Sequence, residues 1–393
     1  MKQGWEYKKL GEVCYPKNKI QRATKCFDTS DKIFYIDISS IDNTIQKMSD
    51  VISVTFGDAP SRAQQKVEYG DIIVSTVRPN LKNIAIIDRY ESNLVASSGF
   101  CVLRNTEHVE RNYLFHYITS DLFTQHLMKL TTGANYPAVR DQDVRDSIIP
   151  IPPKSTQLSI VSELDKINEL IRLKKEQLKD YDNLAQSIFY EMFGDPVENE
   201  KGWEVKKMKD VCTHIVDCPH STPKKADTTT NYPCIRTSEL KGGTISWSTM
   251  QYLEKDEYEK RIARLKPETG DIIFGREGTI GDAVILPSGY NFSLGQRTML
   301  IRTDNEMIIN TFMHRTLMSE WIKHQIEYVN VSSTVAHVNI KDFKLFDVPL
   351  PPLPLQHLFA QRIEQIERQK SAVQKSITDL ETLLASRMQY WFE

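Results

Sequence analysis

The chain has 393 residues, 40% of them hydrophobic, with 50 Lys and Arg against 52 Asp and Glu. This length exceeds what one hydrophobic core usually supports, so we expect two or more domains, and the ordinary composition excludes a disordered or fibrous chain. The formal net charge of −2 neither supports nor excludes nucleic-acid binding, because such domains are usually basic but can segregate their charges on one face.

The N-terminal residues and the cysteines indicate where the chain works. No apolar run approaches the roughly 18 residues of a membrane span. MKQGWEYKKL at the start has no apolar stretch like that of a secretory signal. The 6 cysteines lack paired spacing, which is typical of a reducing compartment. We therefore expect a cytoplasmic protein without a membrane partner.

The first 150 residues are predicted to form a mixed α/β domain. Short runs rich in β-branched residues and bounded by Gly, Asp, Asn or Pro indicate strands at 33–38, 70–77, 83–88 and 100–104. One helix is expected near 111–129. The sequence IPIPP then cannot be helical, so it marks an abrupt boundary.

A long helix is predicted after this boundary. Residues 155–193 contain neither Pro nor Gly, and their apolar positions fall at alternating three- and four-residue steps. This spacing is typical of a coiled-coil seam, and Gly194 provides a helix stop. The residues that we expect to pair in this seam are Val161, Leu164, Ile171, Leu178 and Ile188.

The second half repeats the first in the same order. GWEYKKLGEVC at 4–14 returns as GWEVKKMKDVC at 202–212, with seven of the eleven positions identical. GDII at 70–73 returns at 270–273, and IPIPP returns as VPLPP at 348–352. Offsets of 198, 200 and 199 in chain order predict two diverged copies of one unit, which is too long for a solenoid repeat.

The second copy has matching elements. Strands are expected at 232–237, 270–275, 282–286 and 298–302, with a helix near 307–328. A second long helix follows at 355–392. Its predicted seam residues are Ile363, Ile366, Val373, Ile377, Leu380 and Leu384.

These elements predict an α+β fold with globular domains at 1–150 and 196–350 and long helices at 151–195 and 351–393. A helix of about 38 residues is roughly 57 Å long. Packed as an antiparallel coiled coil, two such helices would hold the domains apart with pseudo-twofold symmetry. Paired DNA readers address sites separated by whole turns of roughly 34 to 36 Å, so the geometry suits that task. The alternative, two amphipathic helices each packed on its own domain, stays open.

The order GWE, GDII, PIPP, Gln, long helix, FGDP and GWE resembles the specificity subunits of Type I restriction-modification systems over essentially the full chain. The resemblance implies that each globular domain is a target recognition domain for one part of a split sequence in double-stranded DNA. It also implies that the helices dock two methyltransferase subunits, which bind S-adenosylmethionine and methylate adenine. This chain would then be non-catalytic and would bind no cofactor, and restriction subunits are left open as further partners.

Candidate DNA-contacting residues of the first copy lie in two stretches. STVRPNLKN places Arg78, Asn80, Lys82 and Asn83 in a loop after a strand. Arginine can bind guanine through two hydrogen bonds and asparagine can pair with adenine, whereas Lys82 suits a phosphate. TGANYPAVR adds Tyr136 and Arg140. A solvated turn is the alternative interpretation of the first stretch.

Candidate DNA-contacting residues of the second copy come from several stretches. The first is DCPHSTPKK, whose hydroxyl and ammonium groups can bind phosphate. FGREGTIGD lacks the Lys and Ser or Thr of a phosphate-binding P-loop, so we expect its glycines to shape a turn. The candidates are His220, Ser221, Thr222, Lys224, Lys225, Arg276, Thr279, Gln296, Arg297, His337 and Asn339.

Three other interpretations are weaker. Cys212, His214, Cys218 and His220 lie within nine residues, whereas zinc fingers use two pairs separated by a longer loop, so no metal is predicted. Glu204-Val205-Lys206 has the Glu-x-Lys spacing of a metal-dependent nuclease but lacks a convincing partner Asp. A scaffold that joins two protein partners without DNA also stays open.

Overall fold

The structure is a computed structural model, and it describes all residues except 1, 3, 50, 134, 135, 196, 279 and 331–336. The chain divides into two compact units. Unit 1 comprises Met1–Glu176 and Gln374–Glu393, and unit 2 comprises Gln177–Val373. The long helices α5 (Lys154–Phe193) and α10 (Leu353–Phe392) each contribute residues to both units.

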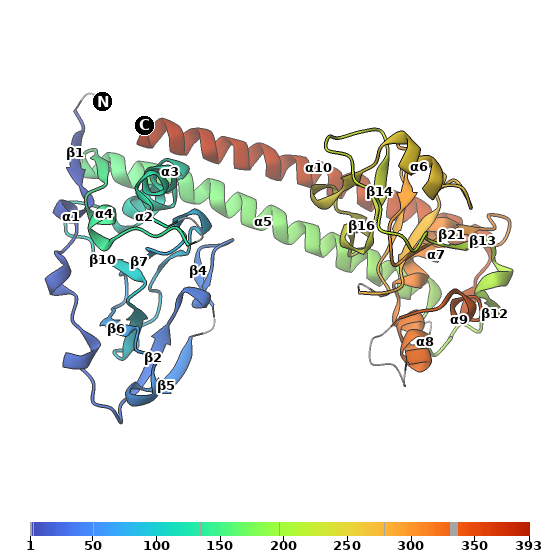
Figure 1. Ribbon diagram of the computed structural model, residues 1–393, viewed down its shortest axis with the longest axis horizontal. Helices are drawn as coiled ribbons and strands as arrows, with labels where there is room; N and C mark the ends of the chain where they lie inside the picture. Colours follow the sequence, from blue (N-terminus) through green and yellow to red (C-terminus); the bar gives the residue numbers. More distant parts are fainter. Residues whose placement is uncertain are drawn as a thin grey trace. The chain divides into compact units, whose positions relative to one another are not determined.

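The globular part of unit 1 begins and ends on a pair of antiparallel strands, β1 and β11. Its strands are β1 (Glu6–Lys9), β2 (Lys32–Ile36), β3 (Ile41–Asp42), β4 (Lys47–Met48), β5 (Ile52–Thr55), β6 (Ala63–Lys66), β7 (Ile72–Ser75), β8 (Ile84–Ile86), β9 (Leu94–Ser97), β10 (Phe100–Leu103) and β11 (Ile148–Ile151). Its helices are α1 (Leu10–Val13), α2 (Arg111–Thr119), α3 (Asp121–Leu130) and α4 (Asp141–Arg145) (Figure 1).

Strand β7 is the centre of unit 1. It pairs antiparallel with β10 and β8, while a second sheet runs in the order β5-β2-β9-β6 with β2 and β9 parallel. Ile72 and Val74 face a core that includes α2, α3 and the start of α5, whereas Ile73 faces a core shared with β2 and β9. A strand buried on both faces has no polar side, which explains the continuous apolar run in the sequence.

Unit 2 repeats this plan with strands β12 to β22. They are β12 (Glu204–Lys207), β13 (Cys212–Asp217), β14 (Pro233–Ile235), β15 (Leu240–Lys241), β16 (Thr244–Ile245), β17 (Gln251–Tyr252), β18 (Ile272–Gly275), β19 (Ala283–Ile285), β20 (Ser293–Leu294), β21 (Thr298–Thr303) and β22 (Asp347–Leu350). Its helices are α6 (Lys255–Arg261), α7 (Asn310–Leu317), α8 (Glu320–Asn330) and α9 (Ile340–Phe343).

The match between the units extends to strand pairing. β18 lies between β21 and β19 as β7 lies between β10 and β8, and β14 runs parallel to β20 as β2 does to β9. Ile272 and Phe274 face one core and Ile273 faces the other. The predicted duplication of one mixed α/β module is therefore confirmed.

Two predicted helices are each broken in the structure. The helix expected near 111–129 is α2 followed by α3, because the Ser120 hydroxyl accepts a hydrogen bond from the Phe123 amide (3.2 Å) and starts a new helix. The helix expected near 307–328 is likewise α7 followed by α8. The prediction of single helices was wrong because a serine inside an apolar periodicity can equally be a helix cap.

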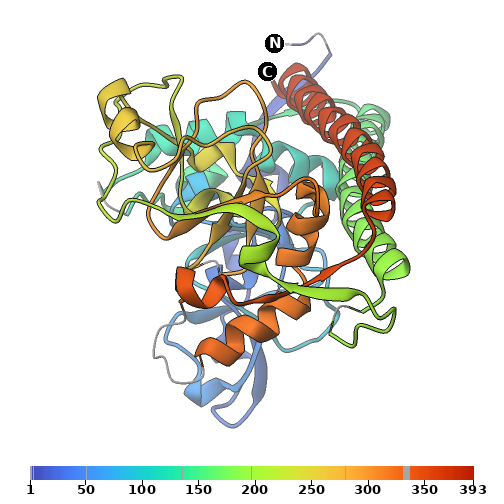
Figure 2. The same ribbon diagram turned by 90° about the vertical axis from the view of Figure 1, so that its right-hand side faces the viewer.

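Helices α5 and α10 lie side by side and antiparallel within each unit (Figures 1 and 2). In unit 1, Arg387 pairs with Glu163, and Lys175 lies 2.8 Å from Glu381. In unit 2, Lys370 lies 2.7 Å from Asp182. Residues further along α5 pair with residues earlier in α10, so the two helices run antiparallel. Interdigitation as a coiled coil stays a prediction.

The predicted seam residues are buried or half-buried. Val161, Leu164, Ile171, Ile363, Ile366, Val373 and Ile377 are buried, and Leu178, Ile188, Leu380 and Leu384 are intermediate. The periodicity did not include Phe189 and Phe193, whose rings pack against Phe359 and Phe312 in the core of unit 2.

Each copy of GWE lies at the end of a long helix. In unit 2, the indole of Trp203 donates to the Phe193 carbonyl (2.8 Å), where α5 ends. In unit 1, Trp5 stacks on Trp391 at 6.3 Å, where α10 ends. The proposed segments 1–150, 151–195, 196–350 and 351–393 stay a prediction, since the compact units include parts of both helices.

Candidate nucleic-acid interface

The loop that follows β7 is held in an uncommon backbone conformation. Arg78 and Lys82 have positive φ angles of 50° and 49°, and they flank a short 3-10 helix, Pro79–Leu81. Left-handed backbone is uncommon for residues other than glycine and is often found at functional sites. Arg78 and Asn80 are exposed at the surface of this loop.

A second stretch, more than fifty residues further along the chain, lies against this loop. The amide of Arg78 donates to the Pro137 carbonyl (2.7 Å), and the amide of Val139 donates to the Thr76 carbonyl (2.9 Å). The guanidinium of Arg78 lies 4.6 Å from the ring centre of Tyr136, whose side chain is 68% exposed. The structure thus brings together the two candidate stretches of the first copy.

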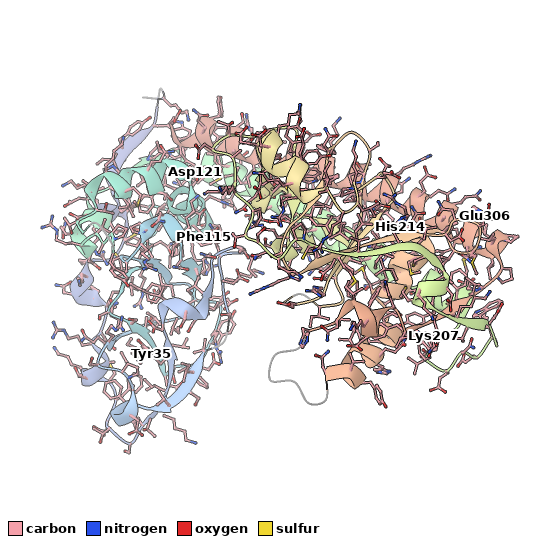
Figure 3. All side chains as sticks on the ribbon, turned by 45° about the vertical axis from the view of Figure 1, so that its right-hand side comes forward. Tyr35, Phe115, Asp121, Lys207, His214 and Glu306 are labelled. Carbon is pink, nitrogen blue, oxygen red and sulfur yellow. The ribbon has the colours of Figure 1, made fainter. Side chains whose placement is uncertain are left out.

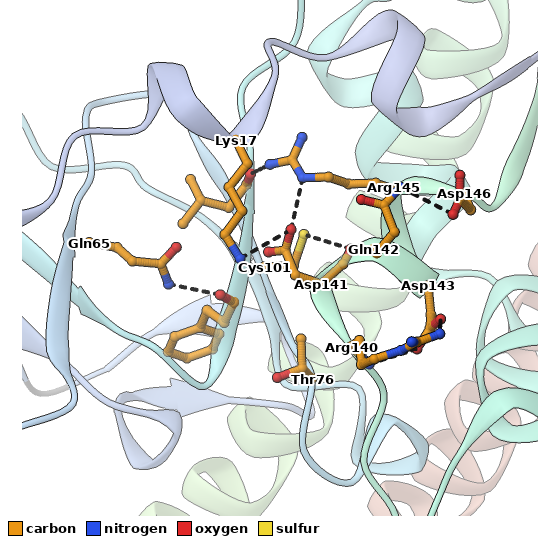
Figure 4. Close-up of polar contacts among 12 residues, drawn as sticks. Lys17, Gln65, Thr76, Cys101, Arg140, Asp141, Gln142, Asp143, Arg145 and Asp146 are labelled. Atoms are coloured by element: carbon orange, nitrogen blue, oxygen red, sulfur yellow. Dashed lines mark hydrogen bonds and ion pairs between the residues drawn. The ribbon is translucent and has the colours of Figure 1, made fainter.

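Helix α4 fixes the end of the second stretch (Figure 4). The buried guanidinium of Arg145 donates to the Val102 carbonyl (2.7 Å), the Tyr15 carbonyl (3.1 Å) and the Asp141 carboxylate (3.0 Å). Arg140, just before the helix, lies at the surface and donates to Asp143 (2.8 Å). This hydrogen bond lowers the pKa of Asp143, so the pair stays charged.

Two candidates of this region make contacts within unit 1, and their predicted role in DNA binding stays a prediction. The ammonium of Lys82 donates to the Asp121 carboxylate (2.6 Å) and to the Thr119 carbonyl (3.0 Å), which ties the loop to α3. Asp121 is labelled in Figure 3. Asn83 is buried, and its main-chain carbonyl accepts from Ser75 (3.0 Å). Asn43, which the sequence did not single out, holds the loop by donating to the Leu81 carbonyl (2.9 Å).

In unit 2, three stretches meet at the corresponding end of β18. The amide of Arg276 donates to the Arg297 carbonyl (3.0 Å), and the amide of Val338 donates to the Arg276 carbonyl (3.0 Å). Glu277 lies opposite His337 in an isolated β-bridge and forms an ion pair with Arg297 (3.2 Å). Arg297 has a positive φ angle of 65° and an exposed side chain.

The loop after β13 joins the same cluster. Gln296 donates to the His220 carbonyl (2.6 Å), and Thr222 lies 3.5 Å from the Gln296 side-chain oxygen. Asp217 forms an ion pair with Arg276 at 3.4 Å, and its carboxylate also lies 3.4 Å from the His220 ring. The Arg276 side chain is 11% exposed, and its ion pair with Asp217 ties the start of this loop to the end of β18.

A buried arginine that the sequence analysis missed organises this loop. Arg261, at the end of α6, is 3% exposed and donates to the carbonyls of Leu294 (2.8 Å), Pro219 (3.2 Å) and Ser221 (3.2 Å). Nothing in the local sequence marks Arg261, because its partners are distant in the chain.

The remaining candidates are placed as follows. Lys224 and Lys225 are exposed beyond this cluster, and among the described residues they form no ion pair. Asn339 precedes α9 and donates to Asp342 (3.3 Å). Thr279 lies outside the described residues.

The structure does not gather the cysteine and histidine motif into a metal site. No group of three or more His, Cys, Asp or Glu that could hold a metal occurs in the described part of the chain. His214 lies exposed on β13 (Figure 3). Burial raises the pKa of Cys212 to about 12 and also raises that of Cys218.

Each unit thus presents an exposed arginine, Arg78 or Arg297, on a loop that main-chain hydrogen bonds hold at the corresponding end of the central hairpin. Two copies of such a surface on one chain define a duplicated recognition module. Residues 2–180 and 200–382 match the family model of the Type I restriction modification DNA specificity domain. The chain belongs to this family.

Several relatives of the chain are named as specificity subunits of type I restriction enzymes. It is 22% identical to the MjaIX specificity subunit of Methanocaldococcus jannaschii over 331 residues, 79% of this chain and 74% of the relative. It is 20% identical to the putative MjaX specificity subunit of that organism, over 97% of this chain and 92% of the relative. The EcoKI specificity subunit of Escherichia coli is 21% identical over 81% of this chain and 72% of the relative.

Solved structures agree with the fold. A chain from a study of complex assembly and conformational transition of the type I R-M system has a TM-score of 0.63 at 26% identity, covering 100% of this chain and 98% of that chain. The Type-I restriction-modification S subunit from M. genitalium has a TM-score of 0.53 at 12% identity, covering 99% of this chain and 96% of that chain. This similarity supports the fold alone. Among the described residues, none of the helices combines the length and apolar character that membrane crossing requires.

Proposed function

We propose that this chain reads a DNA target in two parts, with one unit for each part, as the specificity subunit of a Type I restriction-modification enzyme. The observation that carries the proposal is the duplicated pair of loops. In each unit, the loop after the central strand is hydrogen-bonded to a stretch from the end of the globular region. Such preorganised loops lower the entropy cost of binding.

Exposed residues of these loops suit direct contact with bases. Arg78 and Arg297 can bind guanine through two hydrogen bonds, and Asn80 can pair with adenine. The half-buried amide of Gln296 already contacts His220 and Thr222, so it holds the loop. Glu277, beside Arg297, can accept from the cytosine amino group. Lys224 and Lys225 suit phosphates, which position the protein without specifying sequence.

The chemical steps would belong to partner subunits. Two methyltransferase subunits would dock on the outer faces of α5 and α10, bind S-adenosylmethionine and methylate adenine after extruding it from the duplex. Of the exposed cations on these faces, Arg172 is paired with Glu169 and Glu176, and Arg368 with Glu364. The assembly would act in the cytoplasm, and restriction subunits would be additional partners where the system has them.

The nuclease alternative has little support. Glu204 pairs with Lys206 (3.5 Å) on β12, and Glu6 pairs with Lys8 (2.6 Å) on β1, so both Glu-x-Lys motifs are surface strands with alternating charges. A nuclease would show metal-dependent cutting that Glu204→Ala abolishes. A scaffold without DNA would bind duplex DNA no more salt-dependently than an acidic control protein does.

The proposal can be tested with purified components. The chain, the neighbouring methyltransferase subunit and duplex DNA are incubated with labelled S-adenosylmethionine, together and with each protein omitted. Label should enter DNA only when both proteins are present. Methyl transfer by this chain alone would overturn its non-catalytic role, and full transfer by the methyltransferase alone would overturn its specificity role.

A further inference from the structure

The exposed arginine on the loop after β7 is held differently from its neighbour Arg140. The guanidinium of Arg78 lies over the ring of Tyr136, 4.6 Å from the ring centre, and both side chains are exposed. In the described part of the chain, this guanidinium forms no ion pair and no hydrogen bond. Asp143, by contrast, accepts from Nε (3.2 Å) and Nη2 (2.8 Å) of Arg140. Arg78 is thus held by its flat face, whereas Arg140 is held by its hydrogen-bonding edge.

Contact through the face leaves the donors of a guanidinium available. Its five N–H groups lie in the plane of the group and point outward from its edge, so a ring above the plane blocks none of them. A carboxylate instead occupies the edge that would bind the O6 and N7 atoms of guanine. The stack on Tyr136 therefore fixes the plane of the Arg78 guanidinium while its edge stays open for a base.

The segment that carries Tyr136 also fixes the backbone of Arg78. The Arg78 amide donates to the Pro137 carbonyl (2.7 Å). The segment is closed on itself, since the Thr132 amide donates to the Ala138 carbonyl (2.9 Å) and the Ala138 amide donates to the Thr132 carbonyl (3.0 Å). The backbones that carry the ring and the guanidinium are therefore fixed relative to each other, which favours a stable stack of the two side chains.

Unit 2 differs at the corresponding position. Gly278 stands there, at the offset of 200 residues at which GDII recurs, so that position supplies no guanidinium. At the same end of the hairpin, unit 2 exposes Arg297, whose Nε lies 3.2 Å from the Glu277 carboxylate. We therefore expect a tyrosine stack of this kind to matter only for the part of the target that unit 1 reads.

We propose that Tyr136 is a positioning residue for Arg78, and that Arg78 reads a guanine in the part of the target that unit 1 recognises. The inference rests on the proposed function, because it assigns a base within that target. The ring holds the guanidinium plane before DNA binds, and the open edge then donates two hydrogen bonds to guanine O6 and N7. A guanidinium held in one plane turns less readily to another acceptor, such as a phosphate, so the stack also sharpens the preference for guanine.

The test measures base preference at every position of the target. The purified complex of the full chain and the neighbouring methyltransferase receives S-adenosylmethionine and a library of random duplexes, and single-molecule sequencing reads which duplexes carry methyl-adenine. Arg78→Ala should abolish a preference for guanine at one position. Tyr136→Ala should reduce the same preference by about threefold to tenfold, the range for a side chain that loses its preorganisation, and should leave other positions unchanged. Tyr136→Phe keeps the ring and is the matched control, so it should retain the preference.

A double-mutant cycle separates positioning from direct contact with DNA. Tyr136→Ala should have no further effect in the Arg78→Ala background, whereas a tyrosine that touches a base itself would add its own loss. The slope of DNA affinity against salt concentration reports phosphate contacts, and in Tyr136→Ala it should match the wild type. The melting temperature of Tyr136→Ala should match as well, because the side chain is 68% exposed.

Several results would overturn this inference and leave the proposed function standing. They are an additive loss in the double mutant, a loss of preference in Tyr136→Phe, and a guanine preference that Tyr136→Ala or Arg78→Ala leaves unchanged. Loss of preference for a base other than guanine in Arg78→Ala would overturn the assignment of the base. Methylation that does not depend on this chain would overturn the proposed function, and this inference with it.

Discussion

Gln356 is expected to fasten unit 2 to the start of α10. Its side chain is fully buried, its oxygen accepts from the Ile309 amide (3.0 Å), and its nitrogen donates to the carbonyls of Met307 (3.1 Å) and Pro351 (2.8 Å). Gln356→Leu keeps the volume but leaves one N–H and two carbonyl groups buried without partners. At about 1 to 1.5 kcal/mol for each of the three groups, the loss is about 3 to 4.5 kcal/mol.

Hydrogen–deuterium exchange read by mass spectrometry separates this loss from the behaviour of unit 1. Peptides covering residues 307–310 should exchange about a hundredfold faster or more in the variant, corresponding to a loss of about 3 kcal/mol or more in local stability. Gln365→Leu, an exposed position on the same helix, should change little. Gln157 makes the matching contacts in unit 1, so Gln157→Leu should affect unit 1 peptides instead. A change of less than about 0.5 kcal/mol for Gln356→Leu would refute the reasoning.

Three further predictions concern buried charged or titratable groups. Arg302→Met removes the two hydrogen bonds to the buried carboxylate of Asp271, so urea unfolding should show unit 2 destabilised by about 3 kcal/mol. An unchanged free energy of unfolding would show that this ion pair does not stabilise unit 2. Burial lowers the pKa of His314 to about 4, below its usual value near 6.5, while its ring nitrogen bonds the Ala283 carbonyl. The neutral, buried His314 ring therefore stabilises the fold fully above about pH 6.5, and the free energy of unfolding should fall by up to about 3 kcal/mol as the pH falls to 4. Urea unfolding of His314→Gln should lack this pH dependence. Arg261→Met should release the loop after β13 and lower affinity for target DNA about tenfold by fluorescence anisotropy, and unchanged affinity would show that the loop is not preorganised.

Patterns within one stretch of sequence predicted much of the fold. The apolar run after Gly70 and its repeat after Gly270 predicted the central strands, and the three- and four-residue steps predicted both long helices. These signals succeed because strand alternation and helix periodicity depend on neighbouring residues. The duplication supplied an internal check, since each element had to recur at a fixed offset.

The contacts of individual side chains could not be predicted in the same way. Lys82 is predicted to contact phosphate, and the sequence did not predict its ion pair with Asp121, on a helix nearly forty residues further along the chain. Asn83 looked like a loop residue and is buried under the same loop. Arg261 carried no signal at all, because its three carbonyl partners come from distant loops. Such pairings arise only when the strands are assembled.

The most direct test of the account is genome-wide single-molecule mapping of methyl-adenine in cells that express this chain with its neighbouring methyltransferase. The account predicts a split motif that disappears without this chain. Arg78→Ala with Asn80→Ala should alter one part of the motif, and Arg297→Ala should alter only the other. Methylation that does not depend on this chain, with the methyltransferase demonstrably active, would contradict the account.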